Sequence, residues 1–145
     1  MVKVLVKRLN SKVKLPEYKT SGSSGMDLMA CLDSPIKIAS NSLELIPTGL
    51  SIAIPEGLEI QIRPRSGLAA KNNISVLNTP GTIDSDYRGE IKIILFNHGN
   101  SEFVINNKDR VAQMILTPIE KIELDEVENL PDTLRSKGGF GSTGR

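Results

Sequence analysis

The chain has 145 residues, of which 18 are basic and 17 acidic, and its formal net charge is +1. This length fits one domain, and the balanced charge argues against a nucleic-acid binder that relies on a broad basic face. The single cysteine, Cys31, excludes an internal disulfide and indicates a reducing compartment. Charges interrupt every apolar run of residues 1–10, so we expect no signal peptide, no membrane partner and a cytoplasmic protein.

Short strands are predicted along most of the chain. Apolar patterning and turn signals place them at residues 2–9, 27–31, 36–38, 43–46, 48–54, 58–63, 74–77, 90–97, 103–105, 111–117 and 119–124. The clearest alternation is at 58–63, where Leu58, Ile60 and Ile62 share one face. Residues 66–73 favour one helical turn at most. The pattern therefore indicates an all-β fold, either a sandwich or a barrel.

The C-terminal residues differ from the rest. From Ser136 onward, the sequence S-K-G-G-F-G-S-T-G-R is almost free of apolar side chains and cannot stabilise itself by burial. We expect a folded domain at residues 1–135 and a flexible tail at residues 136–145. The tail contains G-x-G-x-x-G, but no helix follows, which excludes a dinucleotide site. Its glycines and hydroxyls suit phosphate, although a disordered tail explains the composition equally well.

Residues 78–90, N-T-P-G-T-I-D-S-D-Y-R-G-E, place two carboxylates and a ring between turn signals. The turn residues on both sides predict a hairpin that holds Asp84, Asp86 and Tyr87 near a bend. A calcium loop is excluded, because Arg88 stands where a ligand is needed and no helices flank the segment. A few polar groups on a rigid frame beside an aromatic wall suit a small molecule. The segment therefore predicts the active site of a nucleotide hydrolase.

Two further segments carry anion-binding groups. Arg65, Ser66 and Gly67 offer a guanidinium, a hydroxyl and an approachable backbone N–H within three residues. A solvated turn with surface arginines explains them equally well. Arg110 and Gln113 stand at the start of a predicted strand, where an ordinary exposed strand end is the simpler interpretation.

Taken together and in order, five segments resemble the motifs of the trimeric dUTPases. They are S-G-M-D-L at 24–28, R-P-R-S-G-L-A at 63–69, the whole of 78–90, R-V-A-Q at 110–113 and R-S-K-G-G-F-G-S-T-G at 135–144. The resemblance implies a distorted jelly roll or β-barrel of short strands with a flexible Gly-rich C-terminal tail. It implies a dUTP diphosphatase that uses Mg²⁺ to hydrolyse dUTP to dUMP and pyrophosphate, which limits uracil incorporation into DNA and supplies dUMP for thymidylate synthesis. It also implies a homotrimer with sites shared between subunits.

The resemblance further implies roles for individual residues. Asp84 corresponds to the general base that activates water for attack on the α-phosphorus, and Asp27 to an acid near the metal, acting through water. Asp86 is assigned to the structure of the hairpin. The residues expected to contact dUTP are Arg65, Ser66, Gly67 and Gln113 at the phosphates, Asn78, Thr82 and Ile83 at uracil, Tyr87 at deoxyribose, and Arg135, Phe140, Gly141, Ser142 and Thr143 in the tail.

Rival functions remain open at this point. The dCTP deaminases have a related fold, but they tend to carry Pro-Gly-Phe where this chain has Ser85-Asp86-Tyr87, which favours a dUTPase. A bifunctional deaminase is disfavoured for the same reason. A non-catalytic nucleotide-sensing module on the same fold would lack the base, whereas Asp84 is present.

Overall fold

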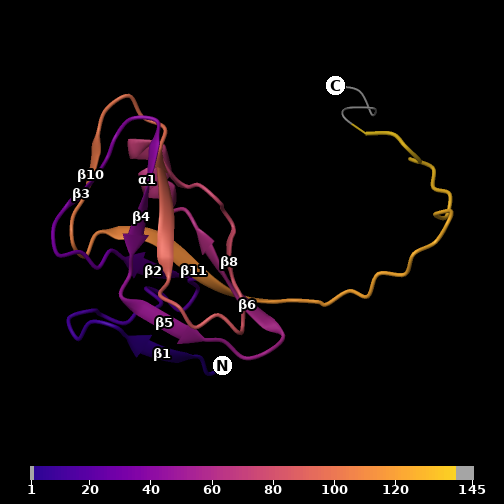
Figure 1. The fold of residues 1–145 in the computed structure, drawn as a ribbon, viewed down its shortest axis with the longest axis horizontal. Coiled ribbons are helices and arrows are strands. Elements are labelled where there is room, and N and C mark those ends of the chain that lie inside the picture. Colours follow the sequence, from indigo (N-terminus) through magenta and orange to yellow (C-terminus); the bar gives the residue numbers. More distant parts are fainter. Residues whose placement is uncertain (1, 140–145) are drawn as a thin grey trace.

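The structure, a computed structural model, describes residues 2–139 and consists almost entirely of strands and loops (Figure 1). In that range the elements are β1 (Leu5–Arg8), β2 (Met26–Met29), β3 (Ile36–Ile38), β4 (Ser42–Pro47), β5 (Leu50–Ala53), β6 (Leu58–Arg63), α1 (Ser66–Asn72), β7 (Ile74–Val76), β8 (Gly81–Ile83), β9 (Lys92–Asn97), β10 (Phe103–Ile105) and β11 (Arg110–Pro118). The all-β prediction is confirmed.

The described strands form small antiparallel sheets around one apolar core. The strand orders are β1-β5, β10-β3, β2-β11-β6-β8 and β4-β9-β7. All pairs are antiparallel, as expected for a jelly roll of short strands. The fold therefore places β6 between β11 and β8, and the candidate site lies along these three strands.

Alternation along the strands accounts for the core. Leu50, Ile52 and Ile54 are at most 5% exposed, and Ile60 and Ile62 are 3% and 4% exposed. Ile60 and Ile62 lie on the face that the alternation at 58–63 grouped together. Since side chains alternate between the two faces of a strand, their neighbours are left for the surface or for a site.

The segment after β6 is more helical than predicted. The pattern favoured one turn at most, whereas α1 spans seven residues. Asn73 ends it in the left-handed region at φ 56°, and its N–H donates to the carbonyl oxygens of Ala69 and Leu68. Asparagine tolerates this conformation, which closes the helix and returns the chain to β7.

Within residues 2–139, no helix is long and apolar enough to cross a membrane.

The predicted hairpin is only partly correct. Its flanking strands do pair, since Ile74 of β7 lies opposite Asn97 of β9. The connection is not a simple bend, however. It leaves the β4-β9-β7 sheet, and its strand β8 pairs with β6 in the β2-β11-β6-β8 sheet. Asp84 and Tyr87 therefore follow the end of a strand that belongs to a different sheet from β9.

The strand predicted at 119–124 is wrong. After β11, the N–H of Ile119 donates to the carbonyl oxygen of Gly57, and the chain then leaves the body as an extended arm, residues 119–139 (Figure 1). Ile122 and Leu124 are 81% and 86% exposed. Apolar alternation makes a strand only where a partner strand offers its backbone groups. The described part of the chain offers none to this segment.

Candidate functional site

Asp27 organises one end of the candidate site. Nε of Arg65 donates to its Oδ1 over 2.8 Å, and Nη1 of Arg110 faces its Oδ2 at 3.4 Å. Nη1 of Arg65 also donates to the carbonyl oxygen of Arg110, at 3.2 Å. The Asp27 side chain is only 19% exposed, so this charge is balanced within the protein. We call Asp27, Arg65, Arg110 and Gln113 the arginine cluster.

Strand pairing brings Gln113 into this cluster. It lies opposite Asp27 of β2 on one side and opposite Arg63 of β6 on the other. Its Nε2 donates to the carbonyl oxygen of Pro64 over 2.9 Å. A Cβ on Gly25 would lie 3.0 Å from the Oε1 atom of Gln113, so a glycine is needed there for the two strands to approach.

Ser66 and Gly67 follow Arg65 directly and open α1. The first intrahelical bond runs from the N–H of Ala69 to the carbonyl oxygen of Arg65. The backbone N–H groups before Ala69 have no acceptor within the helix. Together with the two guanidinium groups, these donors give the cluster the composition of an anion site.

A second group of predicted residues gathers around β8. Thr82 pairs with Gln61, and Ile83 pairs with Ile60. The Asn78 side chain lies against Gly81. A Cβ at position 81 would lie 3.1 Å from Nδ2 of Asn78. The backbone and carboxamide groups at 78–83 therefore lie beside β6. Gly81 is the position where the Asn78 side chain approaches the backbone.

Asp84 lies at the end of β8, on a cavity of about 650 Å³. The cavity is lined by Ile54, Glu56, Leu58, Glu59, Asp84, Ser85, Asp86, Arg88, Ile119 and Lys121. Its volume is that of a small-molecule site. In the described part of the chain, no three His, Cys, Asp or Glu side chains converge as a metal site. The cavity thus has room for a ligand. Its acidic residues, Glu56, Glu59, Asp84 and Asp86, do not converge on one point.

Tyr87 is held by its own loop. Its N–H donates to the carbonyl oxygen of Asp84 over 3.2 Å, and its phenol donates to the carbonyl oxygen of Glu90 over 3.0 Å. The phenol crosses Gly89 so closely that a Cβ there would overlap with it. Tyr87 as a whole is 43% exposed, so it is accessible to a ligand.

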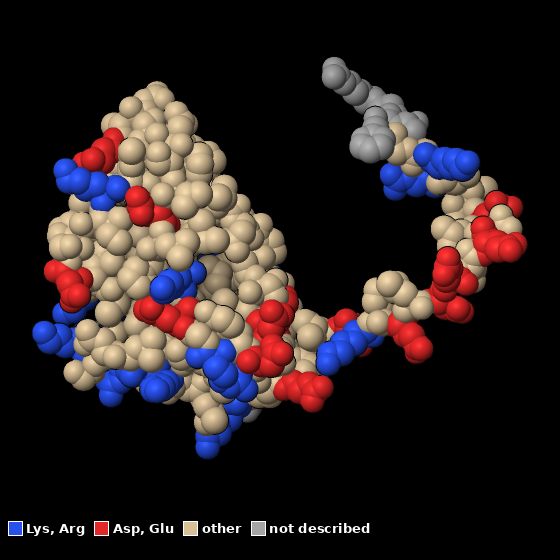
Figure 2. Space-filling view, viewed as in Figure 1, with Lys and Arg blue, Asp and Glu red and all other residues tan. Residues whose placement is uncertain are grey.

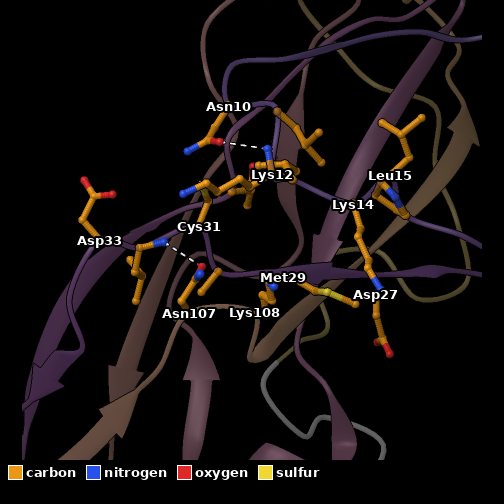
Figure 3. A pocket seen from close by; sticks show the side chains of 16 residues that line it. Asn10, Lys12, Lys14, Leu15, Asp27, Met29, Cys31, Asp33, Asn107 and Lys108 are labelled. Atoms are coloured by element: carbon orange, nitrogen blue, oxygen red, sulfur yellow. Dashed lines mark hydrogen bonds between the residues drawn. The ribbon is translucent and has the colours of Figure 1, made fainter.

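A smaller cavity, of about 260 Å³, adjoins the arginine cluster (Figure 3). It lies between the N-terminal segment and β2, and its rim carries Lys12, Lys14 and Lys108. Figure 3 shows Asp27 at one edge of the cavity, beside Lys14. On the N-terminal segment, a hydrogen bond from the Lys19 ammonium and the charge of that group lower the pKa of Glu17.

The structure does not bring the two groups of residues together within one chain. Gln113 pairs with Arg63 at one end of β6, and Ile83 pairs with Ile60 near the other. Extending this register places Asp84 beside Glu59, four residues from Arg63, or about 13 Å along the strand. This separation is too large for Asp84 and Gln113 to contact the same phosphate group.

The tail residues are the remaining part of the prediction. Phe140, Gly141, Ser142 and Thr143 lie outside the described residues. Arg135 lies on the arm, where its Nε donates to the carbonyl oxygen of Gly138 over 2.9 Å. Figure 2 shows acidic side chains spaced along the arm and basic ones near its described end.

Two residues belong to the site although sequence reasoning gave them no role there. Arg110 was part of the motif at 110–113, with an ordinary strand end as the simpler interpretation, yet its guanidinium faces Asp27. Gly25 was only part of a motif, yet it admits Gln113. No local pattern carries this information, because both contacts depend on the pairing of β2 with β11. The contact between Gly25 and Gln113 could have been found only by predicting that pair.

The whole chain is similar to known proteins of one family. A model of the dUTPase family matches residues 11–144. The deoxyuridine 5'-triphosphate nucleotidohydrolase of Rickettsia bellii (strain OSU 85-389) is 56% identical, over 99% of this chain and 97% of its own length. The Rickettsia felis protein of that name is 53% identical, over 99% and 98%. The one from Syntrophotalea carbinolica is 48% identical, over 99% and 97%.

Solved structures share the fold. The dUTPase of Staphylococcus bacteriophage 80alpha, solved with dUPNHPP, is 23% identical, with a TM-score of 0.89 over all of both chains. A mutant dUTPase from phage phi11 of S. aureus, described with a structural Mg(II) ion, is 22% identical. Its TM-score is 0.81 over 90% of this chain and all of that chain. At this identity the likeness supports the jelly-roll fold and nothing finer.

Proposed function

The chain belongs to the dUTPase family, and from this we infer that it hydrolyses dUTP to dUMP and pyrophosphate. The observation that carries this function is the 56% identity, over 99% of the chain, to a deoxyuridine 5'-triphosphate nucleotidohydrolase. The reaction removes a precursor of uracil in DNA and yields the dUMP from which thymidylate is made. The same identity leaves the deaminase and non-catalytic alternatives without an observation in their favour.

Asp84 is proposed as the general base. It would take a proton from a water molecule as that water attacks the α-phosphorus, and the bond from phosphorus to the bridging oxygen would break to release pyrophosphate. Its place at the end of β8, on a cavity of about 650 Å³, supports this role, because the carboxylate can meet both water and ligand. Asp86 lines the same cavity and is proposed to support the loop.

The arginine cluster is proposed to bind the phosphates. Arg65 and Gln113, with the N–H groups of Ser66 and Gly67, would donate hydrogen bonds to phosphate oxygens that gain charge in the transition state. The ion pair with Asp27 supports this, because it fixes the Arg65 guanidinium in place before the ligand binds.

Mg²⁺ is proposed as the cofactor, bound together with the triphosphate. Magnesium keeps several waters in its coordination shell and needs only one or two carboxylates beside phosphate oxygens. Asp27 would contact the hydrated ion only through water, because both of its carboxylate oxygens already face arginines. When bound, the ion would neutralise charge on the phosphate oxygens.

Selection of deoxyuridine is proposed to rest on the segment from Asn78 to Tyr87. The Asn78 carboxamide and the backbone of Thr82 and Ile83 would pair with the edge of uracil. Cytosine presents a donor where uracil has an acceptor, so the mismatch would cost about 1–3 kcal/mol for each buried group left unpaired. The Tyr87 ring would pack on deoxyribose and exclude a 2′-hydroxyl.

We further propose a homotrimer in which each site is shared between subunits. The separation of about 13 Å between the two groups along β6 supports this, because a neighbouring chain can supply the missing half. An apolar face of the β4-β9-β7 sheet also needs cover: Leu43, Leu45 and Leu77 are 47%, 47% and 48% exposed. Sedimentation analysis that gave a monomer at micromolar concentration would contradict this assembly.

The tail is proposed to close the site of another subunit. Residues 136–145 would form the closing segment and residues 1–135 the domain that carries it. The arm supports this arrangement, since its exposed apolar side chains have no cover on their own body. In that position, Arg135, Ser142 and Thr143 would bind the terminal phosphate, Phe140 would lie over uracil, and Gly141 would allow a close backbone approach. The expected cytoplasmic location stays a prediction.

The function is tested by measuring pyrophosphate release from dUTP, dCTP, dTTP and UTP under the same conditions. We expect release from dUTP and strong discrimination against the other three nucleotides. No release from dUTP by the purified full-length chain would contradict the proposal, and release from dCTP with deamination would favour the rival enzyme.

A further inference from the structure

The Glu90 side chain links the loop that carries Tyr87 to a distant turn. Its Oε1 accepts a hydrogen bond from the N–H of Gly49 over 2.8 Å, between residues 41 positions apart in the sequence. Its Oε2 lies 4.0 Å from Nζ of Lys92, and the Glu90 side chain is 24% exposed. Glu90 therefore has one firm partner on another part of the fold and one weak ionic neighbour.

Gly49 is a rigid anchor for this bond. It has φ +67°, a conformation that favours glycine, and a Cβ there would lie 3.0 Å from Sγ of Cys31 and closer still to Val13. Its carbonyl oxygen also accepts from the N–H of Leu9 over 2.8 Å. Packing and hydrogen bonding thus fix the N–H that Glu90 binds.

The chain on the other side of Glu90 is held by the same turn. The N–H of Ile91 donates to the carbonyl oxygen of Leu50 over 2.8 Å. The carbonyl oxygen of Ile91 accepts from Oγ1 of Thr48, a residue that is 1% exposed, over 2.7 Å. The backbone of Ile91 and the side chain of Glu90 together fix the exit of the loop.

The position of the Tyr87 ring depends on the backbone of Glu90, where the loop ends. Its phenol donates to the carbonyl oxygen of Glu90, and the ring crosses Gly89 to reach it. The other hydrogen bonds within this loop are local: the N–H of Tyr87 donates to the carbonyl oxygen of Asp84, and Nη1 of Arg88 donates to those of Ser85 and Tyr87. The position of the ring is therefore set by where the backbone of Glu90 is held.

We propose that Glu90 is a positioning residue that sets the Tyr87 ring for discrimination against ribonucleotides. It acts through the Gly49 N–H and its own carbonyl oxygen, without touching the substrate. This rests on the proposed function, in which Tyr87 packs on deoxyribose. A ring held at one place rejects a 2′-hydroxyl by contact, whereas a ring free to move can make room for it.

The experiment compares E90A with E90Q, using dUTP and UTP as paired substrates. E90A removes the acceptor, while E90Q keeps a carbonyl oxygen at the same distance along the side chain. We expect E90A to lower the ratio of kcat/KM for dUTP over UTP about 10-fold, with kcat for dUTP changed less than about 3-fold. E90Q should restore the ratio to within about 2-fold of the wild type. E102A serves as the control, because Glu102 pairs with Lys37 on the surface near β10.

A second readout needs no turnover. The chain has two tyrosines, so ring-labelled tyrosine gives NMR spectra in which Tyr87 is readily assigned. E90A should broaden or shift the Tyr87 ring signals and speed hydrogen exchange at the Gly49 amide, and E90Q should do neither. If E90A does not fold, E90D, which withdraws the carboxylate by one methylene, carries the same expectations.

The outcomes separate this proposal from the function on which it rests. A wild-type chain inactive on dUTP would refute the function, and the NMR arm would then decide the role of Glu90. An active wild type with unchanged selectivity in E90A would overturn the positioning role alone. Equal losses of selectivity in E90A and E90Q would overturn it as well, since the carbonyl acceptor would then not matter.

Discussion

Nε of Arg65 lies 2.8 Å from Oδ1 of Asp27, so an acid on β2 holds the guanidinium that precedes α1. D27A should release Arg65 and Arg110 and leave their charges without a partner. Loss of a hydrogen bond to a charged group costs about 1.5–3 kcal/mol, which predicts a fall of roughly 10- to 150-fold in kcat/KM for dUTP. Steady-state kinetics measures this, with D33N as the matched control. A variant with wild-type kinetics would show that the ion pair has no part in the reaction.

D84N tests the proposed base. The amide has nearly the same shape as the carboxylate but cannot accept a proton from water, so kcat should fall at least ~100-fold while dUTP still binds. Single-turnover pyrophosphate release and calorimetric titration with a non-hydrolysable dUTP analogue measure the two effects separately. D86N, on the same cavity, should change kcat only modestly. Near-normal turnover in D84N would refute its role.

G25A tests the close approach of β2 and β11. The new methyl group would lie 2.9 Å from Cγ1 of Ile115 and 3.0 Å from Oε1 of Gln113. Such overpacking costs about 1–3 kcal/mol, so the thermal midpoint should fall by several degrees, and displacement of Gln113 should also raise KM. G22A is the matched control, because nothing lies within 4 Å of a Cβ at that position. Equal melting curves for the two variants would contradict the crowding.

Truncation before Gly138 tests the tail. The proposed closing segment would be lost, whereas every strand of the body would remain. We expect the oligomeric mass to be unchanged and turnover of dUTP to fall at least ~10-fold, since donors from the tail would no longer reach the phosphates. Light scattering and steady-state kinetics check the two halves of this prediction. Full activity in the truncated chain would remove the closing role.

Removal of divalent metal tests the cofactor. With EDTA, the charge on the phosphate oxygens would be balanced by Arg65 and backbone donors alone, so turnover should fall about 10-fold or more. Added Mg²⁺ should restore it, and the oligomeric mass should be the same in both states. Turnover that is insensitive to EDTA would show that the reaction does not need the ion.

Much of the fold could be predicted from the sequence because strand faces follow local alternation. The stretch at 58–63 shows this, since both of its central isoleucines are buried. The strand predicted at 119–124 shows the limit. Ile122 and Leu124 are separated by a charged residue, as in a half-buried strand, although Ile119 is out of phase with them. A strand also needs a neighbour, and pairing is a property of the whole chain. The same reasoning explains why the β8 crossover was not foreseen.

The candidate site also has a part that local sequence predicts and a part that depends on distant contacts. Residues within one short segment, such as Asp84 and Tyr87, could be proposed as site candidates from their types and spacing, and their roles stay predictions. The contact of Arg110 with Asp27 spans 83 positions in the sequence, and that of Glu90 with Gly49 spans 41. Contacts of this length depend on register between strands, which a single sequence does not encode locally. Positioning groups were therefore missed more often than groups proposed to touch the substrate.

Charge is distributed unevenly along the arm, as Figure 2 shows. Its first part carries one base, Lys121, and the acids Glu120, Glu123, Asp125, Glu126, Glu128 and Asp132, whereas the charged residues at 135–139 are Arg135 and Lys137. A nucleoside triphosphate is a polyanion, so its field repels the first part of the arm and attracts the end. In the proposed closing role of the tail, this polarity would turn the end of the arm toward a bound triphosphate before contact. Salt limits the range of this steering to about 8 Å at physiological ionic strength.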